Sequence, residues 1–159
     1  MPSNHLEDLV AQWYEYKEYF VRRNVLVGKR AKGGWAGELD VVVFDPRTRA
    51  IKHIETSGDS DRWDVREKRF RHKFEMGRQH IPGLFKGLGD IGEIESIAVL
   101  SNVGGTSVKS VGGGRVVPLR VFLEPLVDEL KKQPWLRQAV PESFPLIRTI
   151  QMVGNLFVD

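Results

Sequence analysis

The chain has 159 residues, of which 41% are hydrophobic and 28% charged, a globular composition that suffices for one domain with a core. No apolar run is long enough to span a bilayer and residues 1–5 show no signal-peptide pattern, so we expect no membrane contact and a cytoplasmic location. Cysteine is absent, which excludes disulfides, thiolate nucleophiles and cysteine-bound zinc. We expect a single domain over residues 1–159.

The first predicted elements are a helix and a strand. Ser3 and Asn4 can cap the helix, in which apolar side chains recur at three- and four-residue steps as far as about Phe20. The strand is expected over residues 24–30, and Gly33-Gly34 indicates a loop after it.

A β-hairpin is predicted next, with strands over residues 37–44 and 50–55 joined by a turn around Arg47 and Thr48. In this register Asp40 faces Glu55. The first strand ends in a continuous apolar run, which is typical of a strand that is covered on both faces. Asp40 therefore lies where a central strand emerges from the core.

The remaining elements follow from apolar periodicity, glycines and prolines. They are a helix over about 62–79 ended by Pro82-Gly83, a strand over 95–100, a glycine-rich mobile loop or hairpin tip within 102–115, a short edge strand at 116–117, and helices over 118–132 and 141–153. The order α-β-β-β-α-β predicts an α/β fold with a core over about 4–101 and a C-terminal hairpin and helices over about 102–159.

The opposed carboxylates of Asp40 and Glu55 need compensation, because like charges directly across an antiparallel pair are destabilising. A divalent cation between them would supply it, since Mg²⁺ prefers oxygen ligands and keeps waters that a phosphate can displace. The simpler alternative is that one carboxylate is solvated and the other caps a turn.

The net charge is only +3, but basic residues crowd residues 22–32 and 62–78, on either side of the acidic hairpin. A carboxylate site bordered by cationic surface suits a phosphodiester, although the second group can also be a solvated helix face. The residues that we single out for nucleic-acid binding are Arg22, Arg23, Lys32, Arg66, Lys68 and Arg69.

The N-terminal helix, the hairpin with Gly37-Glu38-Leu39-Asp40 and Ile54-Glu55-Thr56-Ser57, and the basic helix after it resemble the PD-(D/E)XK, or restriction-endonuclease-like, nuclease superfamily. The match spans about residues 6–81, with 95–100 as the fourth strand. The resemblance implies a mixed central sheet flanked by helices, and Mg²⁺- or Mn²⁺-dependent hydrolysis of DNA. Asp40 and Glu55 would bind the metal, and the Thr56 carbonyl would complete its shell.

Ser57 departs from the family pattern, which has a lysine at this position that orients or deprotonates the attacking water. Lys52 cannot replace it, because its odd spacing from Glu55 places it on the other face of the sheet. Lys73 borders the apolar face of the next helix and can reach back to the hairpin, whereas Lys68 points further out. We assign Lys73 as the displaced lysine, with a phosphate contact or plain surface charge as its alternatives.

Further candidates lie around the pair. An acidic residue on the first helix often assists the metal in this superfamily, and Glu7 is preferred to Glu15 and Glu18 because it lies on the packed face. Glu38 shares a strand face with Asp40 and is either a second ligand or a rim charge. His53 shares the face of Glu55, where a lone histidine is more often structural.

Two other classes of function stay open. The chain can be a nuclease fold without catalysis that binds nucleic acid or serves assembly, or a binding protein without metal. The glycines at 112–114 do not indicate a nucleotide-binding loop, because no Gly-Lys-Ser/Thr follows them. A double-strand cut would need a homodimer, and the apolar C-terminal helices can supply that contact.

Overall fold

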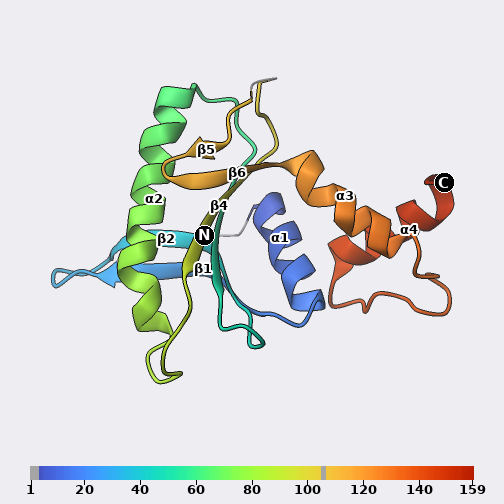
Figure 1. Ribbon diagram of the computed structural model, residues 1–159, viewed down its shortest axis with the longest axis horizontal. Coiled ribbons are helices and arrows are strands. Elements are labelled where there is room, and N and C mark those ends of the chain that lie inside the picture. Colours follow the sequence, from blue (N-terminus) through green and yellow to red (C-terminus); the bar gives the residue numbers. More distant parts are fainter. Residues whose placement is uncertain (1–3, 105–106) are drawn as a thin grey trace.

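The computed structural model describes residues 4–104 and 107–159, and its element order agrees with the prediction (Figure 1). The elements are α1 (His5–Tyr16), β1 (Phe20–Lys29), β2 (Trp35–Phe44), β3 (Ile51–Ser57), α2 (Trp63–Leu84), β4 (Ile94–Leu100), β5 (Ser110–Val111), β6 (Gly114–Pro118), α3 (Leu119–Leu130) and α4 (Pro145–Phe157). No helix in these two ranges is both long and apolar enough to cross a membrane.

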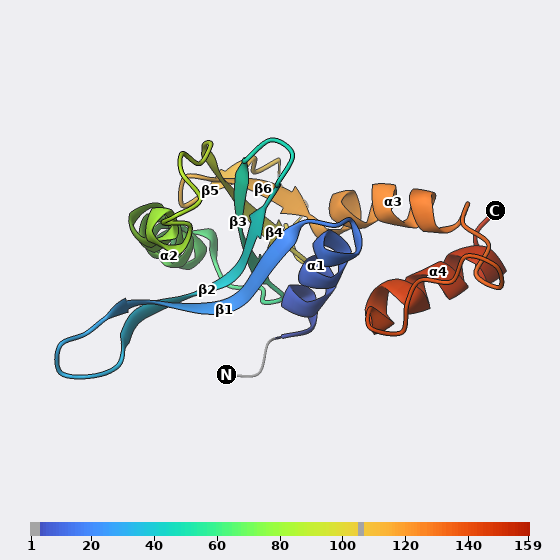
Figure 2. The same cartoon turned by 90° about the horizontal axis from the view of Figure 1, so that it is seen from below.

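The strands form one six-stranded mixed sheet in the order β1-β2-β3-β4-β6-β5. β3, β4 and β6 run parallel, and the other neighbours are antiparallel. α2 packs on one face of the sheet and α1 on the other, whereas α3 and α4 extend to one side (Figures 1 and 2). The fold is therefore of the mixed α/β class, with helices flanking the sheet.

The apolar run of β2 is buried on both faces, as predicted. Val42 and Phe44 belong to the core beneath α2, and Val41 and Val43 belong to the core beneath α1. β2 pairs with β3 in the predicted register, from Phe44 opposite Ile51 to Val41 opposite Ile54. A shift by one residue would exchange the two faces of the strand, so the two-sided core and the short turn together fix this pairing.

The boundary between α1 and β1 lies earlier than expected. Asn4 caps the helix through a reciprocal capping box with Glu7, as predicted, while Ser3 lies outside the described residues. The helix ends at Tyr16 because Glu18 adopts a left-handed backbone with φ of 66°, which cannot continue a helix. Phe20 therefore already pairs with Phe44 as the first residue of β1.

α2 continues past its predicted end at Gln79 and includes Pro82. Proline removes one helical hydrogen bond and crowds the preceding turn. Pro82 lies only two residues before the end of α2, so few backbone hydrogen bonds of the helix follow it. Ile81 and Phe85 are buried in the core beneath α2, and this burial favours the extra turn.

The C-terminal region differs from the prediction at two points. β6 is an interior strand, because β5 pairs along its outer side. α4 begins at Pro145 and not at Pro141, and proline suits this first helical position. The glycine-rich segment contains the β5–β6 hairpin, one of the two forms expected for it, although residues 105–106 of it lie outside the described ranges. Gly112 forms its turn with φ of +57°, and an added Cβ would lie 2.2 Å from the Arg71 nitrogen.

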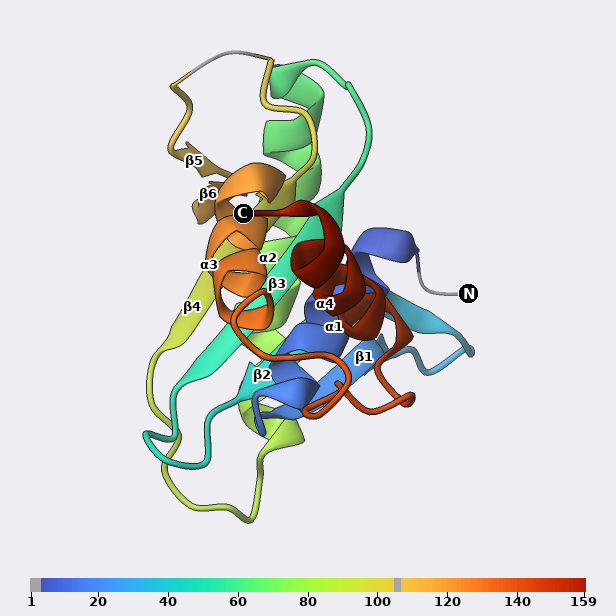
Figure 3. The ribbon, with the colours of Figure 1, turned by 90° about the vertical axis from the view of Figure 1, so that its right-hand side faces the viewer.

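α3 and α4 pack against the outer side of α1 through a separate apolar cluster (Figure 3). Leu9 of α1 contacts this cluster, which also holds Leu126 and Leu130 of α3 and Ile147 of α4. The two C-terminal helices thereby pack on the side of α1 that faces away from the sheet. The N-terminus of α1 is directed at the β2–β3 hairpin.

Candidate active site

Asp40 and Glu55 lie at a fork where β2 and β3 separate. Beyond the Val41–Ile54 pair, the Asp40 amide N–H donates to Glu55 Oε1 at 3.1 Å, and the Thr56 amide N–H donates to Asp40 Oδ2 at 3.0 Å. Each carboxylate thus accepts a hydrogen bond from a backbone amide of the opposite strand. Buried amides require such partners, so the fork itself holds both side chains in place.

Asn24 of β1 contributes to this geometry, and the sequence analysis did not assign it a role. Arg23 pairs with Val41 and Val25 with Leu39, whereas the intervening Asn24 has φ of 48°. Its side-chain amide donates to Glu7 Oε2 at 3.0 Å and to Glu38 Oε1 at 3.1 Å. Asparagine tolerates the left-handed region better than most residues, so the asparagine at the start of the predicted strand was the available signal.

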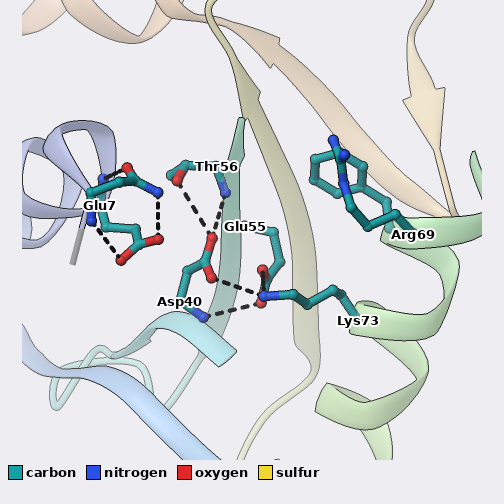
Figure 4. Close-up of a pocket in the computed structure, with 8 residues that line it drawn as sticks. Glu7, Asp40, Glu55, Thr56, Arg69 and Lys73 are labelled. Carbon is teal, nitrogen blue, oxygen red and sulfur yellow. Dashed lines mark hydrogen bonds and ion pairs between the residues drawn. The ribbon is translucent and has the colours of Figure 1, made fainter. Parts of the chain in front are cut away.

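Lys73 reaches from α2 into the fork, the placement that helical periodicity predicted (Figure 4). Its Nζ lies 3.0 Å from Asp40 Oδ1, 2.8 Å from Glu55 Oε2 and 3.0 Å from the Glu38 carbonyl oxygen. The ammonium group therefore supplies the compensating positive charge that we had assigned to a divalent cation. The cation between the opposed carboxylates is, in this structure, part of the protein.

The three side chains line a cavity of about 210 Å³. Lys73 is 31% exposed, whereas the side chains of Asp40 and Glu55 are 9% and 2% exposed. The cavity is open to solvent on the lysine side and closed at its carboxylate floor. Its lining residues are Asn4, Glu7, Asp40, Glu55, Thr56, Arg69, Phe70 and Lys73.

His53 fixes the position of the Glu55 carboxylate from the buried side. The ring is fully buried, its Nε2 lies 2.7 Å from Glu55 Oε1, and its Nδ1 has no hydrogen-bond partner among the described residues. It fits beneath α2 because position 77 is glycine, where an added Cβ would lie 2.1 Å from Nδ1. His53 is a positioning residue, in agreement with the structural role expected for it.

The two carboxyl groups titrate differently. Burial and the neighbouring charge of Glu55 raise the pKa of Asp40 to about 7, although Lys73 acts in the opposite direction. Burial opposes the ionisation of Glu55 as well, but the His53 hydrogen bond and the charge of Lys73 outweigh it and lower its pKa. Burial disfavours the charged form of Lys73, yet the two carboxylates raise its pKa. Lys73 is thus protonated at neutral pH.

Ser57, at the position where the family resemblance predicts a lysine, belongs to a different network. Its hydroxyl donates to the Asp59 carboxylate and accepts from Arg69 Nη2 at 3.3 Å. Burial opposes ionisation of Asp59, but the bonds from Ser57 and the Asp61 amide and the charge of Arg69 lower its pKa to about 2. These side chains occupy the end of β3 beside Glu55. Lys73 is then the basic residue that reaches the carboxylates from α2.

The donor set fits a Mg²⁺ or Mn²⁺ ion bound through two carboxylates, the usual number for Mg²⁺ in a phosphate-processing site. Asp40 Oδ1 and Glu55 Oε2 converge on the Lys73 ammonium nitrogen, so an ion held by these two oxygens would have to displace it, and the Thr56 backbone lies beside Asp40. Within residues 4–104 and 107–159, no group of three or more acidic or histidine side chains is close enough to hold an ion. Glu7 lines the cavity, but its carboxylate is engaged by Asn4 and Asn24.

The other acidic candidates lie elsewhere. Glu15 pairs with Arg23 at 2.7 Å, and Glu18 is exposed beyond the end of α1. Lys52 is bound to Glu95 at 2.8 Å, on the side of the sheet away from Glu55, as expected. Glu38 stays at the rim, where its side chain accepts from Asn24.

The residues predicted to bind nucleic acid divide into two groups. Arg66 does not fit this role, because it is 2% exposed and donates to the carbonyl oxygens of Asn102 and Asp59. Arg23 is bound to Asp8 and Glu15, and Arg69 lines the cavity but is bound to Asp59 and Asp61. The exposed members of the set are Arg22, Lys32 and Lys68.

Comparison with known proteins adds no relative, because no protein-family model and no curated protein matches the chain.

Proposed function

We propose that the chain is a metal-dependent endonuclease with a restriction-endonuclease-like core that hydrolyses DNA phosphodiester bonds. The observation that carries the proposal is the convergence of Lys73 from α2 with Asp40 and Glu55 from the hairpin in one solvent-open cavity. Two carboxylates and a lysine that meet from these elements are the groups that the family resemblance requires, with the lysine displaced from strand to helix.

Asp40 and Glu55 would hold Mg²⁺ or Mn²⁺, with the Thr56 carbonyl as a further ligand. When bound, such an ion polarises the phosphoryl oxygen and lowers the pKa of a bound water. The buried floor of the cavity keeps both carboxylates in one geometry, because backbone amides and His53 hold them independently of any ligand.

Lys73 acts as a cation and not as a base, because the two carboxylates keep it protonated. Its side chain is partly exposed and brings the ammonium group from α2 to the two carboxylates, beside the place where a phosphate oxygen would enter. A positive charge placed there orients the substrate and stabilises negative charge that develops during phosphoryl transfer.

A nicking assay on supercoiled plasmid with Mn²⁺ tests the proposal, with Asp40→Ala against wild type. Nicking by wild type that Asp40→Ala loses supports it. Metal-independent DNA binding without nicking would instead identify an inactive nuclease fold that binds nucleic acid. The neutralisation of both carboxylates by Lys73 is the observation that favours this second candidate.

A double-strand cut would further require two copies of the chain. α4 leaves Val153, Leu156 and Phe157 exposed at the end of the molecule opposite the β1–β2 hairpin (Figure 1). These side chains are the part of the C-terminal helices that can contribute to the expected homodimer, which sedimentation at several protein concentrations would detect.

A further inference from the structure

The hairpin of β1 and β2 projects beyond α2 as an arm, which we define as residues 28–36 (Figures 1 and 2). Its root packs on α2, where Gly28 lies close to His80 and Gly37 close to Met76. Residues 29–35 beyond this root are all exposed. Nothing in the described core requires an extension of this length, so the arm is available for an external partner.

The arm carries uncompensated positive charge. Lys29, Arg30 and Lys32 lie on it, and no acidic residue occurs between Val25 and Gly37. None of the three basic side chains forms an ion pair with a residue in the described ranges. By contrast, Arg69 and Arg71 on α2 are each bound to carboxylates of the chain. The arm is therefore the stronger candidate for contacts with an anionic polymer.

The tip of the arm is an ordered turn. The Arg30 amide donates to the Gly34 carbonyl oxygen and the Gly33 amide to the Arg30 carbonyl oxygen, both at 3.0 Å. Gly33 and Gly34 have positive φ, which glycine adopts without strain. Trp35 pairs directly with Lys29 and is 43% exposed, so an aromatic ring and a cation lie side by side on one face of the ribbon.

The arm leads directly into the fork, since Trp35 and Asp40 lie on the same strand, β2. At about 3.4 Å per strand residue, their Cα atoms are separated by about 17 Å. That length corresponds to about five base pairs of duplex at about 3.4 Å each. The major groove admits a two-stranded β-ribbon, and the sugar-phosphate backbones at its edges suit flanking Lys and Arg side chains.

We propose that the arm binds duplex DNA in the major groove, about five base pairs from the phosphate that enters the fork. The position relative to the fork rests on the proposed nuclease function, whereas the binding itself does not. Lys29, Arg30 and Lys32 contact phosphates, and Trp35 packs against the groove wall.

Binding is measured first, in EDTA so that no cleavage occurs, with a 20-base-pair duplex. The variant Lys29→Ala/Arg30→Ala/Lys32→Ala should bind about tenfold or more weakly at 50 mM salt. Its slope of log affinity against log salt should be shallower by up to about 2.7, since each lost phosphate contact removes about 0.9. The matched control is Arg120→Ala/Lys132→Ala/Arg137→Ala, which removes equal charge from exposed positions on α3 and in the segment that follows it.

The control should change affinity by less than about twofold and leave the salt slope nearly unchanged. Equal weakening by both triple variants would overturn the proposal, because it would show dependence on net charge alone. Unchanged binding by the arm variant would overturn it as well. Trp35→Ala separates the two forms of nucleic acid. If it weakens binding of a single strand more than of a duplex, the ring stacks on unpaired bases and the duplex proposal is wrong.

A hydroxyl-radical footprint then tests the position. Wild type should protect about five more base pairs on one side than the arm variant does, and equal footprints would overturn the placement. These measurements separate the two proposals. If binding depends on the arm but the protein never nicks plasmid, the nuclease proposal is wrong and the proposal that the arm binds DNA is supported. If nicking depends on Asp40 but binding does not depend on the arm, the nuclease proposal is supported and the arm proposal is wrong.

Discussion

Two regions of the β1–β2 hairpin carry charge in opposite ways. At Asp40 the charges are buried, and each has partners fixed by backbone amides, His53 or Lys73. At the arm the charges are exposed, and the described residues provide them with no counter-charge. Buried charges of fixed geometry suit chemistry on a single phosphate. Exposed charges of the same sign suit sequence-independent binding to many phosphates of a nucleic acid. The following experiments test this division.

The largest effect is expected at the fork. Asp40→Asn and Glu55→Gln should each lower metal-dependent cleavage by about 10³-fold or more, since a lost metal ligand removes several kcal/mol of transition-state stabilisation. DNA affinity in EDTA should stay similar or rise slightly, because negative charge near phosphate is reduced. Nicking rates and binding isotherms measure the two quantities. Full cleavage by both variants would contradict the assignment of the site.

Lys73→Ala should lower the cleavage rate at saturating DNA by about 10²-fold, the lower end of what one positioned group that stabilises transition-state charge contributes. Arg78→Ala is the control, because Arg78 is a basic residue that is exposed on the same helix and does not line the cavity. A loss of affinity with full turnover would make Lys73 a phosphate contact like the arm lysines. Recovery of cleavage by Ser57→Lys in the Lys73→Ala background would support a lysine that has moved from strand to helix.

The stability of the metal-free protein should fall as pH rises from about 5 to 7. The pKa of Asp40 is raised to about 7 in the folded protein. Its unfolded value is about 3.9, so between these values the folded state binds more protons than the unfolded state. The free energy of unfolding then decreases by up to about 1.4 kcal/mol per pH unit. Urea unfolding in EDTA at pH 5, 6, 7 and 8 measures the slope, which Asp40→Asn should flatten.

The smallest expected effect concerns His53, which holds the Glu55 carboxylate in place. Gly77→Ala brings a Cβ within 2.1 Å of His53 Nδ1 and should lower the free energy of unfolding by about 1–3 kcal/mol, a typical value for overpacking. Gly83→Ala in the same helix meets nothing within 4 Å and should be neutral or stabilise by up to about 1 kcal/mol. Equal effects of both substitutions in urea titrations would show that His53 moves freely and does not position Glu55.

Local patterns were sufficient to predict several parts of the molecule. The short turn and the doubly buried apolar run fix the β2–β3 register, so the opposition of Asp40 and Glu55 was readable from the sequence alone. Helical periodicity likewise placed Lys73 beside the face of α2 that meets the sheet. The capping residue Asn4 was identified from side-chain chemistry, because a cap depends on residues only three positions apart.

Tertiary structure decided what depends on contacts between segments distant in the sequence. The sequence showed that the carboxylate pair needs a cation, but only packing of α2 on the hairpin made that cation Lys73. Packing also buried Arg66 against two backbone carbonyl oxygens and gave Asn24 its left-handed backbone beside Glu7. It carried α2 through Pro82, because burial of Ile81 and Phe85 outweighs a local preference. Burial and pairing of a side chain depend on which surfaces meet, and periodicity within one segment does not contain that information.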